Sequence, residues 1–461
     1  MNQVNKKINV RSLIQIDKAL LEDISDLISS KSSQSLLNII YDLHPADIAE
    51  LMNHLSTEDA IYIFHLLDTE TASEVIIEVD ENIREAVLEE TETSKITDIV
   101  DELELDDATD IVAELPDEIA EEVLENLERE DSEDVKELLK YPEDSAGGIM
   151  SSDFISISEH STVKDAIEEI RKYSEDIDHI YQLYVLSDSG KLLGTILLKA
   201  LLINPLEKSI SSIIEEDLIF VTPDTDQEQV AQMMEKYDLI SIPVVDENRI
   251  MLGRITIDDV VDVIHEEAAE DIQKLAGLTE EEEVSDSALT ISRNRLPWLM
   301  VSLIGELVSA SVLSSFQATI EQIYIAGIFI PIVMAMGGSS GTQSAIVVVR
   351  GLATGDIWLG QSFKRLTKEF KVALFNGLAC GAVLLTATLF FWHSGLRFSL
   401  ILSVSLIIIM INATMIGAIV PLILKKFNID PAISTGPFVA TTNDIIGLII
   451  YFSLITLFYF N

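Results

Sequence analysis

The chain has 461 residues and holds 30 Lys plus Arg against 78 Asp plus Glu, yet its mean hydropathy is positive, +0.30. The two properties separate along the sequence. Residues 292–461 contain ten basic and six acidic side chains, whereas residues 1–291 contain 20 basic and 72 acidic ones, a net charge of −52. This division excludes a single soluble domain. The acidic excess excludes a nucleic-acid-binding protein, because it would repel polyphosphate, and the single cysteine excludes a disulfide framework.

Residues 1–140 are predicted to form an acidic, helical, cytosolic domain. From Leu43 to Leu139 the pattern indicates short helices of ten to fifteen residues with weak self-similarity, since Leu43–Leu51 resembles Leu115–Val123. A proline followed by acidic residues is typical of a helix N-terminus. Repeated short helices predict a superhelical solenoid, and the pattern leaves its hand open.

Residues 141–265 contain an internal repeat. Ile149–Ile157 aligns with Ile213–Val221, and each copy is followed by an amphipathic helix, Val163–Lys172 or Gln227–Tyr237. A strand pair around a polar turn follows each helix. The strand pairs are expected at Leu183–Leu186 with Lys191–Leu197 and at Ile242–Val245 with Ile250–Ile257. A strand–helix–strand–strand–helix unit that occurs twice is more often a sensing module than a catalyst, and it resembles a pair of CBS domains.

The second copy resembles the CBS segment whose Thr and Asp hold the ribose of an adenine nucleotide. Here those residues are Thr256 and Asp259, in the run Gly253 to Asp259. The first copy, Gly194 to Ala200, lacks both. A single nucleotide site, for ATP for example, and a purely structural turn therefore both stay open.

Residues 266–291 are predicted to be a connecting helix and a linker. An acidic helix over Asp259–Leu275 is expected to end near Gly277, and Glu280–Glu283 is expected to be a solvated turn. Carboxylates in this helix recur at spacings of three and four, so several share one face. Such a face is commonly just solvated. The alternative is that hydrated divalent cations bridge it to other carboxylates, which suits Mg²⁺ because that ion gives up water reluctantly.

Residues 292–461 are predicted to cross a membrane five times, because a span needs about 20 mostly apolar residues. The spans are expected near 296–320, 323–349, 372–392, 398–424 and 437–460. Nine of the ten basic residues of this part then fall on one side. The positive-inside rule places that side, and the N-terminus, in the cytoplasm and the C-terminus outside a plasma membrane. The start of the chain does not resemble a signal peptide.

We find no nucleophile constellation and no phosphate-binding loop, so the chain is expected not to be an enzyme or an ATP-driven pump. Asp444 would lie roughly 10 Å into the last span, and such a carboxylate favours a cation pathway over an Asp kept neutral by Asn443 or Asn412. For Glu306 in the first span, a functional role and a simple pairing with an Arg or a Ser both stay open. The glycine-rich run 337–344 indicates either close helix packing or carbonyls exposed along a pore.

The order of these parts resembles the MgtE-type magnesium channels. The motifs that carry the resemblance are Ala146–Met150, Asp224–Glu228, Pro243–Asp246, Gln343-Ser344, Asp430–Ala432, and Gly436-Pro437 leading to Asp444. The resemblance extends from about Leu43 to the end of the last span. It implies a multidomain α-rich membrane protein with a helical solenoid, an α/β CBS pair, an acidic connecting helix and a five-helix transmembrane domain.

The resemblance also implies site residues, a homodimer in a lipid bilayer, and Mg²⁺ as both transported and regulatory ion. In the pore, Asp444 would hold hydrated Mg²⁺, Ala440 would offer a carbonyl, and Asp430 would lie at the inner mouth. The cytosolic Mg²⁺-sensing carboxylates would be Glu74, Asp106, Asp110, Asp226, Asp238, Asp259, Asp262, Glu267, Glu270 and Asp271.

One departure from the family pattern concerns the second span, where Ser339 and Thr342 stand in place of asparagines. Either side chain still offers an oxygen. The expected function is a passive Mg²⁺ channel closed by cytosolic Mg²⁺. The alternatives are transport of Co²⁺, Mn²⁺ or Ca²⁺, among which oxygen ligands do not choose, and a membrane-anchored adenine-nucleotide sensor without transport.

Overall fold

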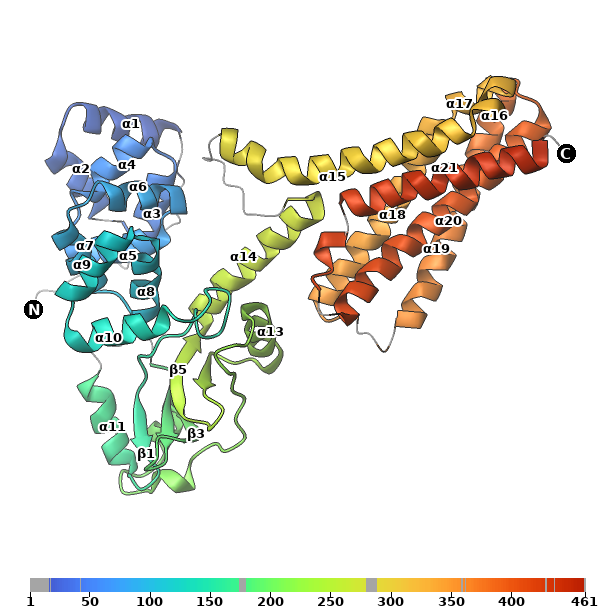
Figure 1. The fold of residues 1–461 in the computed structure, drawn as a ribbon. Helices are drawn as coiled ribbons and strands as arrows, with labels where there is room; N and C mark the ends of the chain where they lie inside the picture. The colour runs from blue at the N-terminus through green and yellow to red at the C-terminus, as the bar shows by residue number, and fades with distance from the viewer. Residues whose placement is uncertain are drawn as a thin grey trace, which may run out of the picture. The chain divides into compact units, whose positions relative to one another are not determined.

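The computed structural model describes residues 16, 18–41, 43–173, 180–278, 288–357, 360, 362–427, 429–434 and 436–459 (Figure 1). The chain divides into two compact units, Met1–His265 and Glu266–Asn461. The first unit contains the acidic helices and the CBS pair. The second contains the end of the connecting helix and the apolar helices. Each unit is described by itself.

The first unit begins, in its described part, with ten helices of eight to twelve residues each. They are α1 (Lys18–Ser29), α2 (Ser33–Ile40), α3 (Pro45–Asn53), α4 (Thr57–Phe64), α5 (Thr69–Glu78), α6 (Glu81–Glu89), α7 (Thr93–Val100), α8 (Leu105–Glu114), α9 (Asp117–Asn126) and α10 (Arg129–Leu138). Those from Pro45 onward are eight to ten residues long, at or below the short end of the predicted length, because capping side chains such as Ser56 and Asp68 begin a new helix soon after each turn.

The stacking of these helices confirms the predicted solenoid. Helices two apart in sequence pack together, as α3 does with α5, α4 with α6, α5 with α7, and α7 with α9. Figure 1 shows the stack from α1 in blue to α10 in teal. Their apolar faces form one core with the second CBS repeat. The buried residues of this core extend along the chain from Ile24 to Val263. The solenoid and the CBS pair therefore bury a shared surface.

The CBS pair has the predicted strand and helix order. Strand β1 (Ser156–Ser158) is parallel to β2 (Gln182–Leu186), which is antiparallel to β3 (Leu192–Leu197), while β4 (Ser241–Val245) and β5 (Met251–Thr256) form a second, antiparallel pair. Helices α11 (Val163–Lys172) and α13 (Gln227–Tyr237) have the predicted bounds, and α12 (Leu198–Ile203) and the 3₁₀ helix η1 (Ile210–Ser212) join the repeats. The first strand of the second repeat is reduced to a bridge between Val221 and Val244.

The connecting helix is one continuous element, α14 (Ile257–Ala276). Its first turns belong to the CBS pair, where Val260 and Val263 are buried in the core. It ends at Gly277, whose φ of +88° is a conformation that side chains with a Cβ rarely adopt. The end near Gly277 was predicted correctly. The turn predicted at Glu280–Glu283 lies outside the described residues.

The second unit confirms five helices that are long and apolar enough to cross a membrane among the residues described. They are α15 (Ala288–Ser315), α18 (Ile330–Ala353), α19 (Ser362–Phe390), α20 (Leu396–Lys426) and α21 (Pro437–Tyr459), with α16 (Gln317–Gln322), α17 (Tyr324–Ile328) and the 3₁₀ helix η3 (Ala432–Ser434) between them. The first helix begins earlier than residue 296. The second begins at Ile330 instead of near 323, because Pro331 lacks an N–H and sits in its first turn.

Small residues bring these helices close together. A Cβ at Gly417 of α20 would lie 2.2 Å from the Gly341 carbonyl oxygen of α18, and Ser340 and Thr414 share a hydrogen bond of 2.7 Å one turn away. Since α18 is helical throughout 330–353, its carbonyls are engaged within the helix. Close packing is therefore the role of the glycine-rich run that the structure supports.

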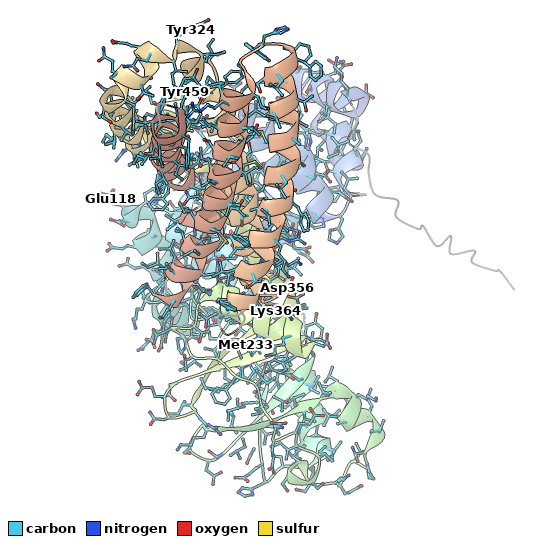
Figure 2. All side chains as sticks on the ribbon, turned by 90° about the vertical axis from the view of Figure 1, so that its right-hand side faces the viewer. Glu118, Met233, Tyr324, Asp356, Lys364 and Tyr459 are labelled. Atoms are coloured by element: carbon cyan, nitrogen blue, oxygen red, sulfur yellow. The ribbon has the colours of Figure 1, made fainter. Side chains whose placement is uncertain are left out.

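The helix ends also fit a membrane crossing. Figure 2 shows Tyr324 and Tyr459 at one end of the helices and Asp356 and Lys364 at the other. Aromatic and basic residues are the side chains expected at the two borders of a bilayer. The end that holds Lys364 is the one to which the predicted topology assigns most of the basic residues.

Candidate ion site and acidic clusters

Asp444 lies in the second turn of α21 and is half-buried. The Asn443 amide nitrogen lies 3.4 Å from its Oδ1, and the carboxyl of Glu306 on α15 is within hydrogen-bonding distance of it. A carboxyl group in this position faces two polar side chains instead of a basic one. Neither of these two contacts supplies a neutralising Lys or Arg, which is the condition in which a mobile cation can bind.

Ala440 precedes Asp444 by one turn in the same helix. In a regular α-helix its carbonyl accepts the hydrogen bond of the Asp444 N–H. A carbonyl oxygen has a second lone pair, so the predicted ligand role remains compatible with the helix. Asp430 lies instead before α21, next to η3, where its Oδ1 accepts a 2.8 Å hydrogen bond from the Ala432 N–H.

One group of carboxylates in the first unit lies where α8 meets the CBS pair. We call it the α8 cluster and define it as Glu104, Asp106, Asp107, Asp153, Asp259 and Arg254. Arg254, which is 4% exposed, lies 3.5 Å from Glu104 in a salt bridge. The charge of this guanidinium acts on Glu104, Asp153 and Asp259, so one cation stands against five carboxyl groups in the cluster, which has an excess of negative charge.

Burial is the main cause of altered acidity in the α8 cluster. It raises the pKa of Asp107 to about 7, and the neighbouring charge of Asp259 adds to the effect. Burial also raises the pKa of Asp106, again with Asp259 as the strongest charged neighbour. For Glu104 burial raises the pKa while Arg254 opposes the shift. Ionising this group of acids without an added cation is therefore unfavourable.

The donor atoms of the α8 cluster are carboxylate oxygens, the type of ligand that hard divalent cations prefer. Asp106 Oδ1 is buried and has no hydrogen-bond partner among the residues described. An orphaned carboxylate oxygen next to other carboxylates is an arrangement that Mg²⁺ with its waters would satisfy. In the described part of the chain, no group of three or more His, Cys, Asp or Glu side chains is arranged so that it could hold a metal ion.

A second group, the α14 cluster, forms in the other unit and consists of Glu270, Asp271, Lys274 and Asp430. Lys274 Nζ lies 2.6 Å from Glu270 and 2.8 Å from Asp430. Burial lowers the pKa of Lys274, but the hydrogen bonds to Asp430 and Glu270 outweigh it and raise the pKa above its usual value. Burial and the charge of Asp430 raise the pKa of Asp271. The structure thus brings two of the predicted sensing carboxylates, Glu270 and Asp271, together with the predicted inner-mouth residue Asp430 around one lysine.

Asp262 faces a carboxylate that the sequence reasoning did not select. Burial raises the pKa of Glu78 at the end of α5, and the charge of Asp262 adds to this shift. Burial likewise raises the pKa of Asp262. The predicted Glu74 lies one turn earlier in α5, exposed, beside a surface cavity of about 360 Å³ that also contacts Glu70. Glu78 is therefore an α5 carboxylate whose pKa responds to the charge of a carboxylate on α14.

Asp226 and Asp238 do not come together. Asp226 is the N-cap of α13 and accepts a 3.3 Å hydrogen bond from the Gln229 N–H. Asp238 ends the same helix in the left-handed conformation, with φ of 52°. The helix separates them by about 16 Å. Both are exposed, as is Asp110, whereas Glu267 is half-buried on α14.

Thr256 and Asp259 form a helix cap. The Thr256 hydroxyl and N–H donate to Asp259 Oδ2 at 2.7 and 3.0 Å, at the start of α14. Thr256 is buried at 4% exposure. These hydrogen bonds give the two residues the structural role that was one of the two alternatives considered for them; the other was a nucleotide site. Asp259 also belongs to the α8 cluster, so one carboxylate joins the cap to the acidic group.

Sequence reasoning missed four acidic members of these groups, Glu78, Glu104, Asp107 and Asp153, and the two basic ones, Arg254 and Lys274. All four are ordinary acidic residues within a very acidic region, and only the packing of α5 and α8 on the CBS pair distinguishes them. Asp107 adjoins the predicted Asp106, so the two-residue acidic first turn of α8 was the one signal available.

Fold and site together define a multi-pass membrane protein in which an acidic solenoid and a CBS pair precede the membrane helices. Comparison with known families agrees. The models for the divalent cation transporter domain MgtE, the MgtE intracellular N domain and the CBS domain match residues 330–454, 43–144, and 146–206 with 210–266. The magnesium transporter MgtE of Bacillus subtilis is 36% identical over 70% of this chain and 71% of its own length, and that of Thermus thermophilus is 34% identical over 69% and 70%.

The chain belongs to the MgtE family. Among solved structures, the cytosolic domain of the Mg²⁺ channel MgtE in complex with ATP matches with 28% identity and a TM-score of 0.50. That match covers 53% of this chain and 99% of the solved one. The resemblance inferred from the motifs is thereby confirmed, as are the helical N domain, the CBS pair and the five apolar helices. The MgtE family is not an enzyme family.

Proposed function

We propose that this chain is a passive, Mg²⁺-selective channel for magnesium uptake that cytosolic Mg²⁺ closes. The observation that supports it most directly is the half-buried Asp444 carboxyl within an apolar helix of an MgtE-family chain. A charged group there is costly unless it meets water or a cation. The relatives named above are magnesium transporters, and the family model describes divalent cation transport.

The pore is proposed to use Asp444 for hydrated Mg²⁺, the Ala440 carbonyl as a second oxygen, and Asp430 at the inner mouth. Hydrated Mg²⁺ suits a site with few protein ligands because it keeps several waters. Membrane potential would drive a 2+ ion inward without another energy source. The same oxygen ligands would accept Co²⁺, Mn²⁺ or Ca²⁺, so selectivity is part of the proposal and needs its own test.

The gate is proposed to consist of the predicted sensing carboxylates. When cytosolic Mg²⁺ is high, ions bind the α8 cluster, the Glu78–Asp262 pair and the α14 cluster and hold the acidic parts in a closed arrangement. When Mg²⁺ falls, the excess of negative charge separates them. The raised pKa values of Asp106, Asp107 and Asp271 support this, because burial and neighbouring carboxylates raise them and a bound cation would favour the ionised groups.

Three further features belong to the proposal. The protein would be a homodimer in the plasma membrane, with its N-terminus in the cytoplasm and its C-terminus outside. The CBS pair would bind ATP next to Thr256 and Asp259, as the related cytosolic domain was solved with ATP. A sensor that binds nucleotide without ion flux is the competing function, and it leaves the intramembrane Asp444 without a role.

Ion flux into liposomes tests the pore. We expect Asp444→Ala and Asp444→Asn to reduce Mg²⁺ flux about tenfold or more, because each removes the charge that offsets the cost of partly dehydrating the ion. Asp356→Asn, an exposed carboxylate between α18 and α19, is the matched control. Undiminished flux in both Asp444 variants would refute the pore role. Parallel assays with Co²⁺, Mn²⁺ and Ca²⁺ measure selectivity, and ATP binding without any flux would select the nucleotide sensor.

Limited proteolysis tests the gate. In the full-length protein, Mg²⁺ should protect the segment Glu266–Gly277 from cleavage, since ion binding would fix α14 and its carboxylates. Cleavage at the same rate with Mg²⁺ and with a chelator would count against a Mg²⁺-closed arrangement.

A further inference from the structure

Glu306 is an acidic residue in the first apolar helix, and α15 presents it to Asp444. The two carboxyl groups lie within hydrogen-bonding distance of each other. The contact between the helices is close at this point, because a Cβ at Gly305 would lie 2.7 Å from Thr441 Cγ2 on α21. A glycine at 305 thus lets α15 approach α21 one turn before Asp444, which sets the register that pairs Glu306 with Asp444.

Asn443 holds the Asp444 carboxyl from the other side. It is 1% exposed, and its Nδ2 lies 3.4 Å both from Asp444 Oδ1 and from the Met334 carbonyl of α18. Its Oδ1 is buried and has no hydrogen-bond partner among the described residues. Gly337 gives it room, since a Cβ there would lie 2.6 Å from that oxygen. The amide anchors Asp444 to α18, and Glu306 is left as the neighbour on the α15 side.

Lysine or arginine on the same helix does not neutralise Glu306. The nearest basic residue along α15, Arg295, precedes it by about 16 Å of helix. At the contact with Asp444, two carboxyl groups therefore lie side by side. Ionised, they repel each other unless a cation lies between them.

We propose that Glu306 is a second carboxylate of the Asp444 site and sets the preference of that site for divalent over monovalent cations. This inference rests on the proposed function. A 2+ ion is attracted to both carboxylates twice as strongly as a 1+ ion at the same distance, so each added carboxylate increases the difference between them. Oxygen ligands from two helices also give a hydrated Mg²⁺ two points of attachment. Asn443 positions Asp444 and is not itself assigned as a ligand.

The test uses the full-length protein in liposomes and measures two quantities, the Mg²⁺ concentration for half-maximal flux and the ratio of Mg²⁺ to Na⁺ flux. Glu306→Gln and Glu306→Ala remove the charge, and Glu306→Asp keeps it. Glu321→Gln on α16 is the matched control, as an exposed glutamate of the same unit whose carboxylate accepts a hydrogen bond from Gln317. We expect the charge-removing variants to raise the half-maximal concentration about tenfold and to lower the flux ratio about tenfold or more. Glu306→Asp should stay within about threefold of wild type, and the control should not change.

The outcomes separate this inference from the proposed function. If wild type conducts no Mg²⁺, the proposed function fails. If wild type conducts and both charge-removing variants keep its half-maximal concentration and its flux ratio, Glu306 is not a determinant and the inference is wrong. A Glu306→Asp variant as impaired as Glu306→Gln would also overturn it, because the effect would then follow side-chain length instead of charge. If Glu306→Gln does not fold, Glu306→Ala, with folding checked by thermal unfolding, decides the question.

Discussion

Replacing Asp107 with asparagine is expected to change the stability of the first unit in opposite directions with and without Mg²⁺. Burial raises the pKa of this carboxyl to about 7, with the charges of Asp259 and Asp110 adding to the shift. An ordinary aspartate has a pKa near 3.9. Between about pH 4 and pH 7 the folded state thus binds a proton that the unfolded chain releases, so stability falls as the pH rises through this interval.

The size of the effect follows from the shift. About three pH units at roughly 1.4 kcal/mol each give an upper limit of about 4 kcal/mol. Neighbouring acids share the protons of the α8 cluster, so we expect about 2–4 kcal/mol for Asp107→Asn above pH 7 without divalent ions. The amide cannot ionise, hence the variant is more stable than wild type under these conditions. For a unit of this size the melting temperature should rise by about 5–10 °C.

Saturating Mg²⁺ should reverse the sign. Wild type gains stability by binding the ion to the folded state, whereas Asp107→Asn has lost one ligand and gains less. The assay is thermal unfolding of the full-length, detergent-solubilised protein at about pH 8 with a chelator or with Mg²⁺. Asp98→Asn, an exposed aspartate on α7, is the control and should not move in either condition. A variant that is destabilised equally in both conditions would refute the reasoning, because Asp107 would then act as a packing residue only.

Three other substitutions follow from single contacts. Arg254→Met should cost about 2–4 kcal/mol of first-unit stability in the presence of a chelator, because it leaves Glu104 and its neighbours without their guanidinium. Mg²⁺ should recover part of this loss, and equal losses with and without Mg²⁺ would contradict the reasoning. Gly417→Ala should lower the free energy of unfolding of the membrane unit by about 1–3 kcal/mol, since its Cβ would lie 2.2 Å from the Gly341 carbonyl oxygen. Unchanged thermal unfolding would show that α18 and α20 can separate at no cost. Tyr451→Phe removes a 2.9 Å hydrogen bond to a backbone carbonyl and should cost about 0.5–1.5 kcal/mol in the same assay, with no effect on Mg²⁺ flux.

Local sequence signals placed several elements of this fold correctly. Helix α11 begins at Val163 because Thr162 and Asp165 form a capping box, and α13 begins after the capping side chain of Asp226. These signals lie within three residues of the boundary that they define, which is why the sequence alone sufficed. Long apolar runs gave the five membrane helices for the same reason.

Features that depend on contacts between distant segments were not predictable. The run from 323 to 349 contains no charged residue, and hydropathy does not register that the helix is interrupted between Ile328 and Ile330. Asp107 and Glu104 look like any other acids of the first unit until α8 is packed against Arg254 of β5. Membership of the α8 cluster is a tertiary property, since burial, and not residue type, separates its carboxylates from solvated ones.

Each of the two acidic clusters has a basic side chain at its centre, Arg254 in one and Lys274 in the other. A tethered cation of this kind compensates the same fraction of the charge at every Mg²⁺ concentration. It therefore lets the carboxylates stay together without metal and leaves a smaller excess for Mg²⁺ to neutralise. In the proposed gate this would reduce the number of ions needed for closure, so the basic residues as much as the acidic ones would determine the Mg²⁺ concentration at which the channel responds.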